Sequence, residues 1–345
     1  MTIRVLVVDD SAFARKVVRE VLESDARFEV VGTARDGLDA LEKIAELKPD
    51  VVTLDLVMPN LDGAGLLAAF STLNVPKLPR VVVVTISEDS SDLAVSALQN
   101  GAISLVHKPT ALATDRLFEL SGELRSAVAA AALATTVPRT TSVPVNTRTA
   151  AAGAAARSTC RVVAIGASTG GPQALTTLLG QIPKDFPVPI VVALHMPVGY
   201  TEALARRLDQ ASAIEVVEAY EGVELLPGRA IIARAGMHLK IVEGAPPRGR
   251  LDLVPLDKPH RPSVDVLLAS AAAAFGEHCM GVVLTGMGED GLIGARALRA
   301  ANAVVLTEAE SSCIVYGMPR SVVEAGMSSG EATLDRMAEE IQRRV

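Results

Sequence analysis

Five polar residues in the first third of the chain each end or follow a run of apolar residues. They are the adjacent aspartates Asp9 and Asp10, then Asp55, Thr85 and Lys108. Apolar runs of this length are typical of buried strands, and ligands of open α/β sheets collect at the carboxyl ends of the strands. We therefore expect the five side chains to lie at one edge of a sheet.

These residue types favour phosphoryl chemistry. Three carboxylates brought together repel one another unless a hard cation lies among them, and Mg²⁺ prefers oxygen ligands. A carboxylate can also act as a nucleophile toward phosphorus. The Thr85 hydroxyl and the Lys108 ammonium would then bind the transferred phosphoryl oxygens. Each aspartate taken alone is more typical of a solvated strand end or helix cap, but the five residues together favour a phosphoryl site.

A second group of residues centres on Ser168. The segment Gly166–Gly170 has the form G-x-S-x-G, follows an apolar run and precedes a helical pattern. This context suits a sharp turn that presents a serine nucleophile at the start of a helix. Glycines at a helix start also suit a phosphate cradle, so the motif alone leaves both readings open. The dinucleotide and Walker patterns are not matched.

A serine nucleophile needs a base and an orienting carboxylate. His195 follows the apolar run after Ser168, so we expect it at the same sheet edge. Asp290 lies in a glycine-rich turn after a third apolar run, and it is preferred to its neighbour Glu289 because it is less flexible. Backbone amides around Met287, in the same turn, could donate to an oxyanion.

The remaining histidines of this half are weaker candidates. His238 and His260 lie in or beside the region 213–255, and His278 follows a probable helix. The chain order Ser–His–Asp also differs from the Ser–Asp–His order of α/β-hydrolases.

The elements that must position these residues alternate between strand and helix. We predict strands over 3–8, 28–34, 51–54, 81–85 and 104–106, and helices over 12–24, capped by Ser11, and 37–47. In the second half we predict strands over 161–165, 190–195, 280–285 and 303–306, and helices over 171–179 and 292–301. Short connections between alternating elements indicate parallel sheets covered on both faces. The region 213–255 is predicted to be an antiparallel insertion.

Composition agrees with two α/β domains. A length of 345 residues suggests about two domains, and 49% hydrophobic against 21% charged residues excludes general disorder. With no Trp, three Tyr and six Phe, the cores must be aliphatic. Residues 126–157 are rich in Ala and Thr and contain no acidic residue, which predicts an interdomain linker. Their Ala-rich first part could instead prolong the preceding helix.

Several function classes are disfavoured. A net charge of −7 argues against a general nucleic-acid binder. Cys160, Cys279 and Cys313 have no metal-ligand spacing and are expected to be reduced, mostly buried thiols. The N-terminal apolar run is too short for a signal peptide, and no apolar stretch is long enough for a membrane span. We therefore expect a cytoplasmic protein.

Residues 1–125 resemble a response-regulator receiver domain. The resemblance rests on VLVVDDS, TLDLVMPNLDG, VVVVT and a Lys-Pro pair after the fifth strand. It implies a flavodoxin-like (βα)5 fold, phosphorylation of Asp55 by a sensor histidine kinase, and Mg²⁺ held by Asp9, Asp10 and Asp55. Leu105 stands where receivers often carry an aromatic switch residue.

Residues 158–345 resemble the catalytic domain of the chemotaxis protein-glutamate methylesterase (CheB) family. Besides the three site segments, AYEGVELLPG, RPSVDVLL and SSCIVYGMPR match. The resemblance implies a doubly wound, mainly parallel α/β domain. It implies the following site residues: the triad Ser168, His195 and Asp290, the Met287 amide in the oxyanion hole, and Thr169 in support.

The two resemblances imply a phosphorylation-activated serine hydrolase of a chemotaxis two-component system. It would demethylate glutamate methyl esters, and deamidate glutamines, on the cytoplasmic helices of chemoreceptors, with no cofactor for the ester reaction. Two segments depart from the family pattern: Thr307–Glu310, in place of a Gln-Asp-Glu run, and Ala233–Gly236, in place of Ala-Pro-Gly-Gly. The alternatives are a catalytically inactive scaffold, a DNA-binding response regulator and a nucleotide-binding enzyme.

Overall fold

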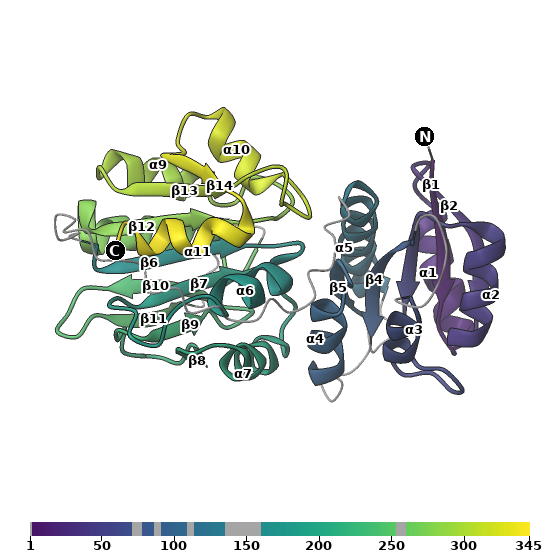
Figure 1. Cartoon of the computed structure of the whole chain (residues 1–345). Helices are drawn as coiled ribbons and strands as arrows, with labels where there is room; N and C mark the ends of the chain where they lie inside the picture. Colours follow the sequence, from purple (N-terminus) through teal and green to yellow (C-terminus); the bar gives the residue numbers. More distant parts are fainter. Residues whose placement is uncertain (1, 71–77, 86–90, 109–113, 135–159, 253–259) are drawn as a thin grey trace. The chain divides into compact units, whose positions relative to one another are not determined.

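A computed structural model describes residues 2–70, 78–85, 91–108, 114–134, 160–252 and 260–345. The chain forms two compact units, and each unit is built around its own sheet (Figure 1). Both are α/β, as the alternating pattern predicts.

The first sheet is parallel throughout, with strand order β2-β1-β3-β4-β5. Its strands are β1 (Ile3–Val8), β2 (Phe28–Ala34), β3 (Val51–Leu54), β4 (Arg80–Thr85) and β5 (Ser104–His107). Its helices are α1 (Ala12–Glu23), α2 (Gly37–Leu47), α3 (Gly63–Ala69), α4 (Ser91–Gln99) and α5 (Thr114–Leu133). Helices α1 and α5 contact each other, whereas α2, α3 and α4 contact one another in succession. This is the predicted flavodoxin-like arrangement.

Side-chain caps begin three of these helices, two of them within three residues of the end of the preceding strand. Ser11 accepts a hydrogen bond from the N–H of the residue three positions on, at 3.3 Å, as predicted for α1. Asp36 and Asp62 do the same for α2 and α3, at 2.9 and 2.7 Å. Each cap satisfies an N–H that the first helical turn leaves without a backbone partner. The caps therefore define where each of these three helices begins.

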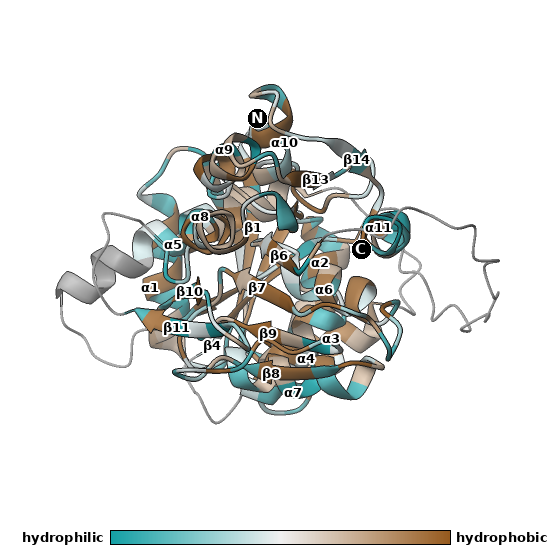
Figure 2. Cartoon of the chain, turned by 90° about the vertical axis from the view of Figure 1, so that its left-hand side faces the viewer, coloured by the Kyte–Doolittle hydropathy of each residue, from teal (hydrophilic) through white to brown (hydrophobic). Residues whose placement is uncertain are grey.

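The second sheet has seven strands in the order β14-β13-β12-β6-β7-β9-β8, and every pair in it is parallel. The strands are β6 (Val162–Ala167), β7 (Ile190–Leu194), β8 (Glu215–Glu218), β9 (Arg229–Ile232), β12 (Cys279–Val283), β13 (Val304–Glu308) and β14 (Gly330–Ala332). The helices are α6 (Gly171–Leu179), α7 (Thr201–Ala211), α8 (Val264–Phe275), α9 (Leu292–Ala300), α10 (Met318–Glu324) and α11 (Leu334–Gln342), with a 3₁₀ turn η2 at Gly276–His278. Figure 2 shows α8 on one face of this sheet and α6 and α11 on the other, as a doubly wound domain requires.

The prediction of an antiparallel insertion over 213–255 is wrong for its first half. Strands β8 and β9 extend the main sheet in parallel, next to β7. Only β10 (His238–Val242) and β11 (Arg248–Asp252) form an antiparallel pair. The last three residues of β9 are all buried, whichever face they point to. Burial on both faces is typical of parallel strands inside a covered sheet, and it explains the difference.

Aliphatic side chains form the core of both units. Residues Val162–Ile165 of β6 are all 0% exposed, and the strands of the second sheet appear as an apolar layer in Figure 2. The expected aliphatic cores are thus confirmed. Among the described residues, no helix combines the length and apolarity needed to cross a membrane.

Two of the element boundaries that differ from the sequence prediction concern the linker and the segment 307–310. Helix α5 continues to Leu133, so the first residues of the segment 126–157 prolong the helix, as the alternative allowed. The Arg80 side chain donates to the Ala134 carbonyl at this helix end, at 3.1 and 2.8 Å. Residues 135–157 lie outside the described part. In the second sheet, β13 continues through Glu308, so half of the departing segment 307–310 is strand.

Gly63 offers a test of how tightly the loop after β3 packs. An added Cβ would lie 2.5 Å from the Asp55 carbonyl oxygen and 2.8 Å from the Leu56 Cα, both backbone atoms. Gly63→Ala should therefore destabilise the first unit by about 1–3 kcal/mol.

The control is Gly122→Ala in α5, where nothing lies within 4 Å of an added Cβ. It should stabilise the helix by about 0.5–1 kcal/mol. Amide hydrogen exchange of β1 and β3 in the full chain measures both, and equal protection in the two variants would contradict this account.

Candidate functional site

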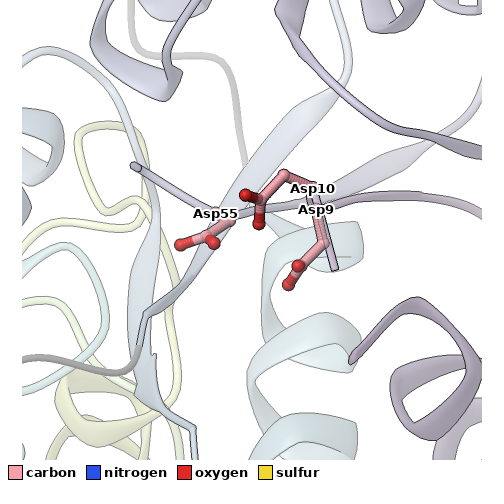
Figure 3. A group of neighbouring side chains, drawn as sticks. All are labelled: Asp9, Asp10 and Asp55. Atoms are coloured by element: carbon pink, nitrogen blue, oxygen red, sulfur yellow. The ribbon is translucent and has the colours of Figure 1, made fainter. Parts of the chain in front are cut away.

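Three aspartates meet at the carboxyl edge of the first sheet. Strands β1 and β3 are hydrogen-bonded neighbours, so Asp9 and Asp55, which follow them, lie side by side. Ligand oxygens of Asp9, Asp10 and Asp55 all lie within 4.8 Å of one another (Figure 3). Asp9 is 3% and Asp55 6% exposed, whereas Asp10 is exposed. The predicted convergence of these carboxylates is confirmed.

Lys108 completes the cluster from β5. Its ammonium forms ion pairs with Asp9 and with Asp55, the latter at 2.9 Å. Its backbone N–H donates to the Thr85 carbonyl at 2.7 Å, which links the ends of β4 and β5. Thr85 itself is buried at the end of β4. The structure therefore brings Lys108 to the carboxylates and places Thr85 at the same sheet edge.

The electrostatics of the cluster leave negative charge in excess. Burial raises the pKa of the Asp55 carboxyl, while the Lys108 ammonium beside it acts in the opposite direction. The Leu56 N–H also donates to the Asp55 carboxylate, at 2.8 Å. One ammonium does not balance three carboxylates, and all three offer oxygen ligands. This donor set fits a hard divalent cation such as Mg²⁺.

Two hydrogen bonds that the sequence analysis did not anticipate fix the loop after Asp55. The Asn60 amide donates to the Asp36 carboxylate at 2.8 Å, and the Gly37 N–H donates to the Leu61 carbonyl at 2.9 Å. Asn60 has a φ of +63°, a conformation that asparagine tolerates better than most residues. The sequence signal that could have indicated this role is the position of Asn60 in a loop that contains Pro, Asp and Gly. Leu105, at the usual aromatic position, is packed in β5 and is 6% exposed.

A serine and a histidine meet at the carboxyl edge of the second sheet. Strands β6 and β7 are neighbours, and Ser168 and His195 directly follow them. Ser168 Oγ and His195 Nδ1 are 3.1 Å apart, and both residues are half-buried. This separation is within the range that a base needs to accept a serine hydroxyl proton. The predicted pairing of Ser168 with His195 is confirmed as a contact.

Asp290 follows β12, the neighbour of β6 on its other side. Its carboxylate accepts hydrogen bonds from the Ser263 hydroxyl at 2.9 Å and from the N–H groups of Val264 and Asp265 at 2.8 and 2.9 Å. These donors form the start of α8. The helix N-terminus thus holds the Asp290 carboxylate in a fixed orientation.

Asp265, in the first turn of α8, caps the start of α9 in the same way. It is 6% exposed, and one of its oxygens accepts the N–H groups of Gly291 and Gly294, at 2.8 and 2.9 Å, at the start of α9. The two helices therefore cap each other through Asp290 and Asp265. The sequence analysis used the segment RPSVDVLL only as a resemblance and missed this role of Ser263 and Asp265.

The turn between β12 and α9 carries Met287. The Gly286 N–H donates to the Val315 carbonyl at 3.0 Å, and the Gly286 carbonyl accepts from Gly317 and Met318 at 3.1 and 2.8 Å. The Met287 side chain is 42% exposed. Thr169 follows Ser168 and is half-buried. The turn preceding Met287 is thus held by backbone hydrogen bonds.

His238, Cys279 and Cys313 are buried, in surroundings that disfavour a catalytic role. His238 is fully buried, burial lowers its pKa, and its Nδ1 accepts the Ser263 N–H at 3.2 Å. Burial raises the pKa of the Cys279 thiol to about 12 and also raises that of Cys313. Neither thiol forms a significant thiolate near neutral pH. These observations favour Ser168 and His195 as the reactive pair.

Comparisons with known proteins cover both units. Residues 163–341 match the family model of the CheB methylesterase, and residues 5–119 match that of the response regulator receiver domain. A protein-glutamate methylesterase/protein-glutamine glutaminase of Myxococcus xanthus is 58% identical over 99% of this chain and 98% of its own. One of Symbiobacterium thermophilum is 42% identical over 99% of this chain and 97% of its own.

A solved structure agrees for the second unit. The crystal structure of the Thermotoga maritima CheB methylesterase catalytic domain superposes with a TM-score of 0.53 at 38% identity. The match covers 54% of this chain and 99% of that one. Together with the two family models and the full-length relatives, it shows that the chain belongs to the CheB methylesterase family, with a response regulator receiver domain preceding the catalytic one.

Proposed function

We propose that this protein is a phosphorylation-activated serine hydrolase of chemotactic adaptation. Its substrates are the γ-methyl esters of glutamates, and glutamine side-chain amides, on the cytoplasmic helices of chemoreceptors. The contact of 3.1 Å between Ser168 Oγ and His195 Nδ1 is the observation that carries the proposal. The relatives are named methylesterase and glutaminase, which corresponds to methanol and ammonia as the two leaving groups.

The proposed reaction proceeds through an acyl-serine. His195 accepts the hydroxyl proton through its unprotonated Nδ1 as Ser168 Oγ attacks the γ-carbonyl carbon. The tetrahedral oxyanion accepts hydrogen bonds from backbone N–H groups at Met287. Methanol leaves with the proton from His195, or ammonia leaves from an amide. Water, deprotonated by His195, then attacks the acyl-serine and releases the glutamate carboxylate.

Asp290, Thr169 and Met287 support this pair in the proposal. The carboxylate of Asp290, held by the start of α8, orients the imidazole of His195 and stabilises its protonated form. Thr169 borders the nucleophile at the start of the turn into α6. The Met287 amide lowers the barrier by stabilising the oxyanion, an effect of about 3–4 kcal/mol for one such donor in other enzymes.

The aspartate cluster of the first unit is the proposed control site. Asp9, Asp10 and Asp55 hold Mg²⁺, whose charge offsets their repulsion when it is bound. Asp55 accepts a phosphoryl group from a sensor histidine kinase, and Lys108 and Thr85 bind the phosphoryl oxygens. The proposed domains are a receiver over 1–125, a linker over 126–157 that begins as the end of α5, and an esterase over 158–345.

Replacement of Ser168 separates a triad enzyme from a scaffold or a nucleotide cradle. Methanol release from methylated receptor membranes should fall by about 10³-fold or more in Ser168→Ala, because the nucleophile is gone. Ser311→Ala is the matched control, since Ser311 is exposed and lies in the same domain. Activity of Ser168→Ala close to that of the wild type would show that the protein is not a serine hydrolase.

Replacement of Asp55 tests the control site. With a small phosphodonor such as acetyl phosphate, wild-type methanol release should rise severalfold, and a phosphorylated species should appear by mass spectrometry. Asp55→Asn should keep the unstimulated rate and gain neither the mass nor the stimulation, because the phosphoacceptor oxygen is lost. Stimulation of Asp55→Asn to the wild-type level would contradict this assignment.

Removal of divalent cations distinguishes the two sites. EDTA should prevent phosphorylation of Asp55, because the carboxylates would repel the incoming phosphoryl group, and added Mg²⁺ should restore it. The unstimulated methanol release should not change, since the proposed ester reaction uses only side chains and backbone N–H groups. An EDTA-sensitive basal rate would point to a metal in the ester reaction itself.

A further inference from the structure

Glu308 is a buried carboxylate in the segment where the chain departs from the family pattern. It is the last residue of β13 and is 0% exposed. Strand β13 pairs with β12 in the register Val283 opposite Thr307. Glu308 therefore lies beside the residues that follow β12, where the turn carrying Met287 begins. Glutamate is seldom fully buried without a partner that justifies it.

Both carboxylate oxygens of Glu308 accept hydrogen bonds. One accepts the backbone N–H of Thr285 at 2.8 Å, and the other accepts the hydroxyl of Ser312 at 2.9 Å. Within the described part of the chain, no lysine or arginine forms an ion pair with it. Burial raises the pKa of the Glu308 carboxyl, and the two donors oppose this effect. Its contacts are those of a hydrogen-bond acceptor rather than of an ion-pair partner.

Thr285 begins the turn that carries Met287. Its Oγ1 accepts the N–H of Val315 at 2.9 Å, and the next residue, Gly286, is bonded through both its N–H and its carbonyl to residues 315–318. The N–H of Thr285 donates its hydrogen bond to Glu308. Glu308 thus fixes the peptide group by which the chain enters the turn, two residues before Met287.

The turn has little room to shift. A Cβ added to Gly317 would lie 2.6 Å from the Gly286 carbonyl oxygen and 3.1 Å from the Gly288 nitrogen. Gly288 has a φ of +84°, in the left-handed region that favours glycine. The backbone before Met287 is therefore closely packed at Gly286, and the backbone after it is conformationally specified at Gly288. A change at Thr285 is passed to the Met287 amide rather than absorbed by loose packing.

We propose that Glu308 is a positioning residue for the ester reaction, which aligns the Met287 amide with the oxyanion by holding the Thr285 N–H. This inference rests on the proposed function. Glu308 does not touch the substrate and acts through the backbone of the turn. In this chain, the segment that departs from the family pattern thus supplies the acceptor at the turn entrance.

According to this proposal, kcat depends on the length of the side chain at position 308, which brings the acceptor oxygen to the Thr285 N–H. It depends little on the charge of that side chain. Glu308→Gln keeps the side-chain length, and its carbonyl oxygen can accept from Thr285 while its NH₂ faces the Ser312 hydroxyl oxygen. Glu308→Asp keeps the charge but is one methylene shorter. Glu308→Ala removes the acceptor. Glu310→Ala is the matched control, because Glu310 is exposed and two residues away.

The experiment measures kcat and KM for methanol release by the full-length variants, with thermal unfolding followed in parallel. Glu308→Ala and Glu308→Asp should lower kcat by about 10- to 100-fold, the size of effect expected from misplacing a catalytic group by about 1 Å. KM should stay within about threefold, because the oxyanion forms only after the substrate binds. Glu308→Gln and Glu310→Ala should keep the wild-type kcat.

Three results would overturn the inference: a wild-type kcat in folded Glu308→Ala, a change confined to KM, or a Glu308→Gln variant as slow as Glu308→Ala. If Glu308→Ala does not fold, the comparison of Glu308→Asp with Glu308→Gln decides, and equal kcat values overturn it. Ser168→Ala in the same assay distinguishes failure of the proposed function from failure of the role proposed for Glu308. Full activity in that variant would refute the proposed function, whereas its inactivity beside a normal Glu308→Ala would refute only the role of Glu308.

Discussion

Parallel pairing of neighbouring strands is the constraint on which both candidate sites depend. Strand β6 lies between β7 and β12, all three run in the same direction, and so the residues that follow them emerge at one edge. Ser168, His195 and Asp290 come from segments far apart in the sequence, and this pairing brings their strands together. In the first sheet, the pairing of β1 with β3 does the same for Asp9 and Asp55. The aliphatic side chains that bury these strands on both faces are what make the parallel sheets stable.

Much of this arrangement follows from local sequence pattern. The runs of Val, Leu and Ile predicted the central strands to within one or two residues, and a polar residue at the end of each run marked the site edge. That Ser168 meets His195 at one sheet edge, and that Lys108 shares an edge with the aspartates, was predicted from their positions at the ends of apolar runs. These successes have one physical cause: a buried parallel strand must be continuously apolar, so its end is visible in the sequence.

What the sequence did not reveal depends on hydrogen bonds between distant segments. The pairing of β8 and β9 with the main sheet depends on burial of β9 beside β7. A short apolar run has the same sequence pattern in an antiparallel hairpin and in a parallel sheet. The mutual capping by Asp265 and Asp290 joins residues about one helix and one strand apart, and no local pattern distinguishes Asp265 from a solvated helix residue. Glu308 is similar: nothing in the surrounding sequence marks it as buried, yet one of its oxygens accepts a peptide N–H that follows another strand.

The treatment of carboxylates distinguishes the two sites. In the first, Asp9 and Asp55 share one ammonium, and Asp10 adds a further charge. Such a cluster is poised to respond to a cation or a phosphoryl group, because either one changes its charge balance. In the second, the hydrogen bonds to Asp290, Asp265 and Glu308 come mainly from backbone N–H groups at helix starts and turn entrances. Backbone donors held by packed elements cannot rearrange easily, so they hold the Asp290 carboxylate and the entrance of the turn that carries Met287 in one arrangement. An unbalanced cluster is suited to a switch, and satisfied carboxylates are suited to repeated chemistry.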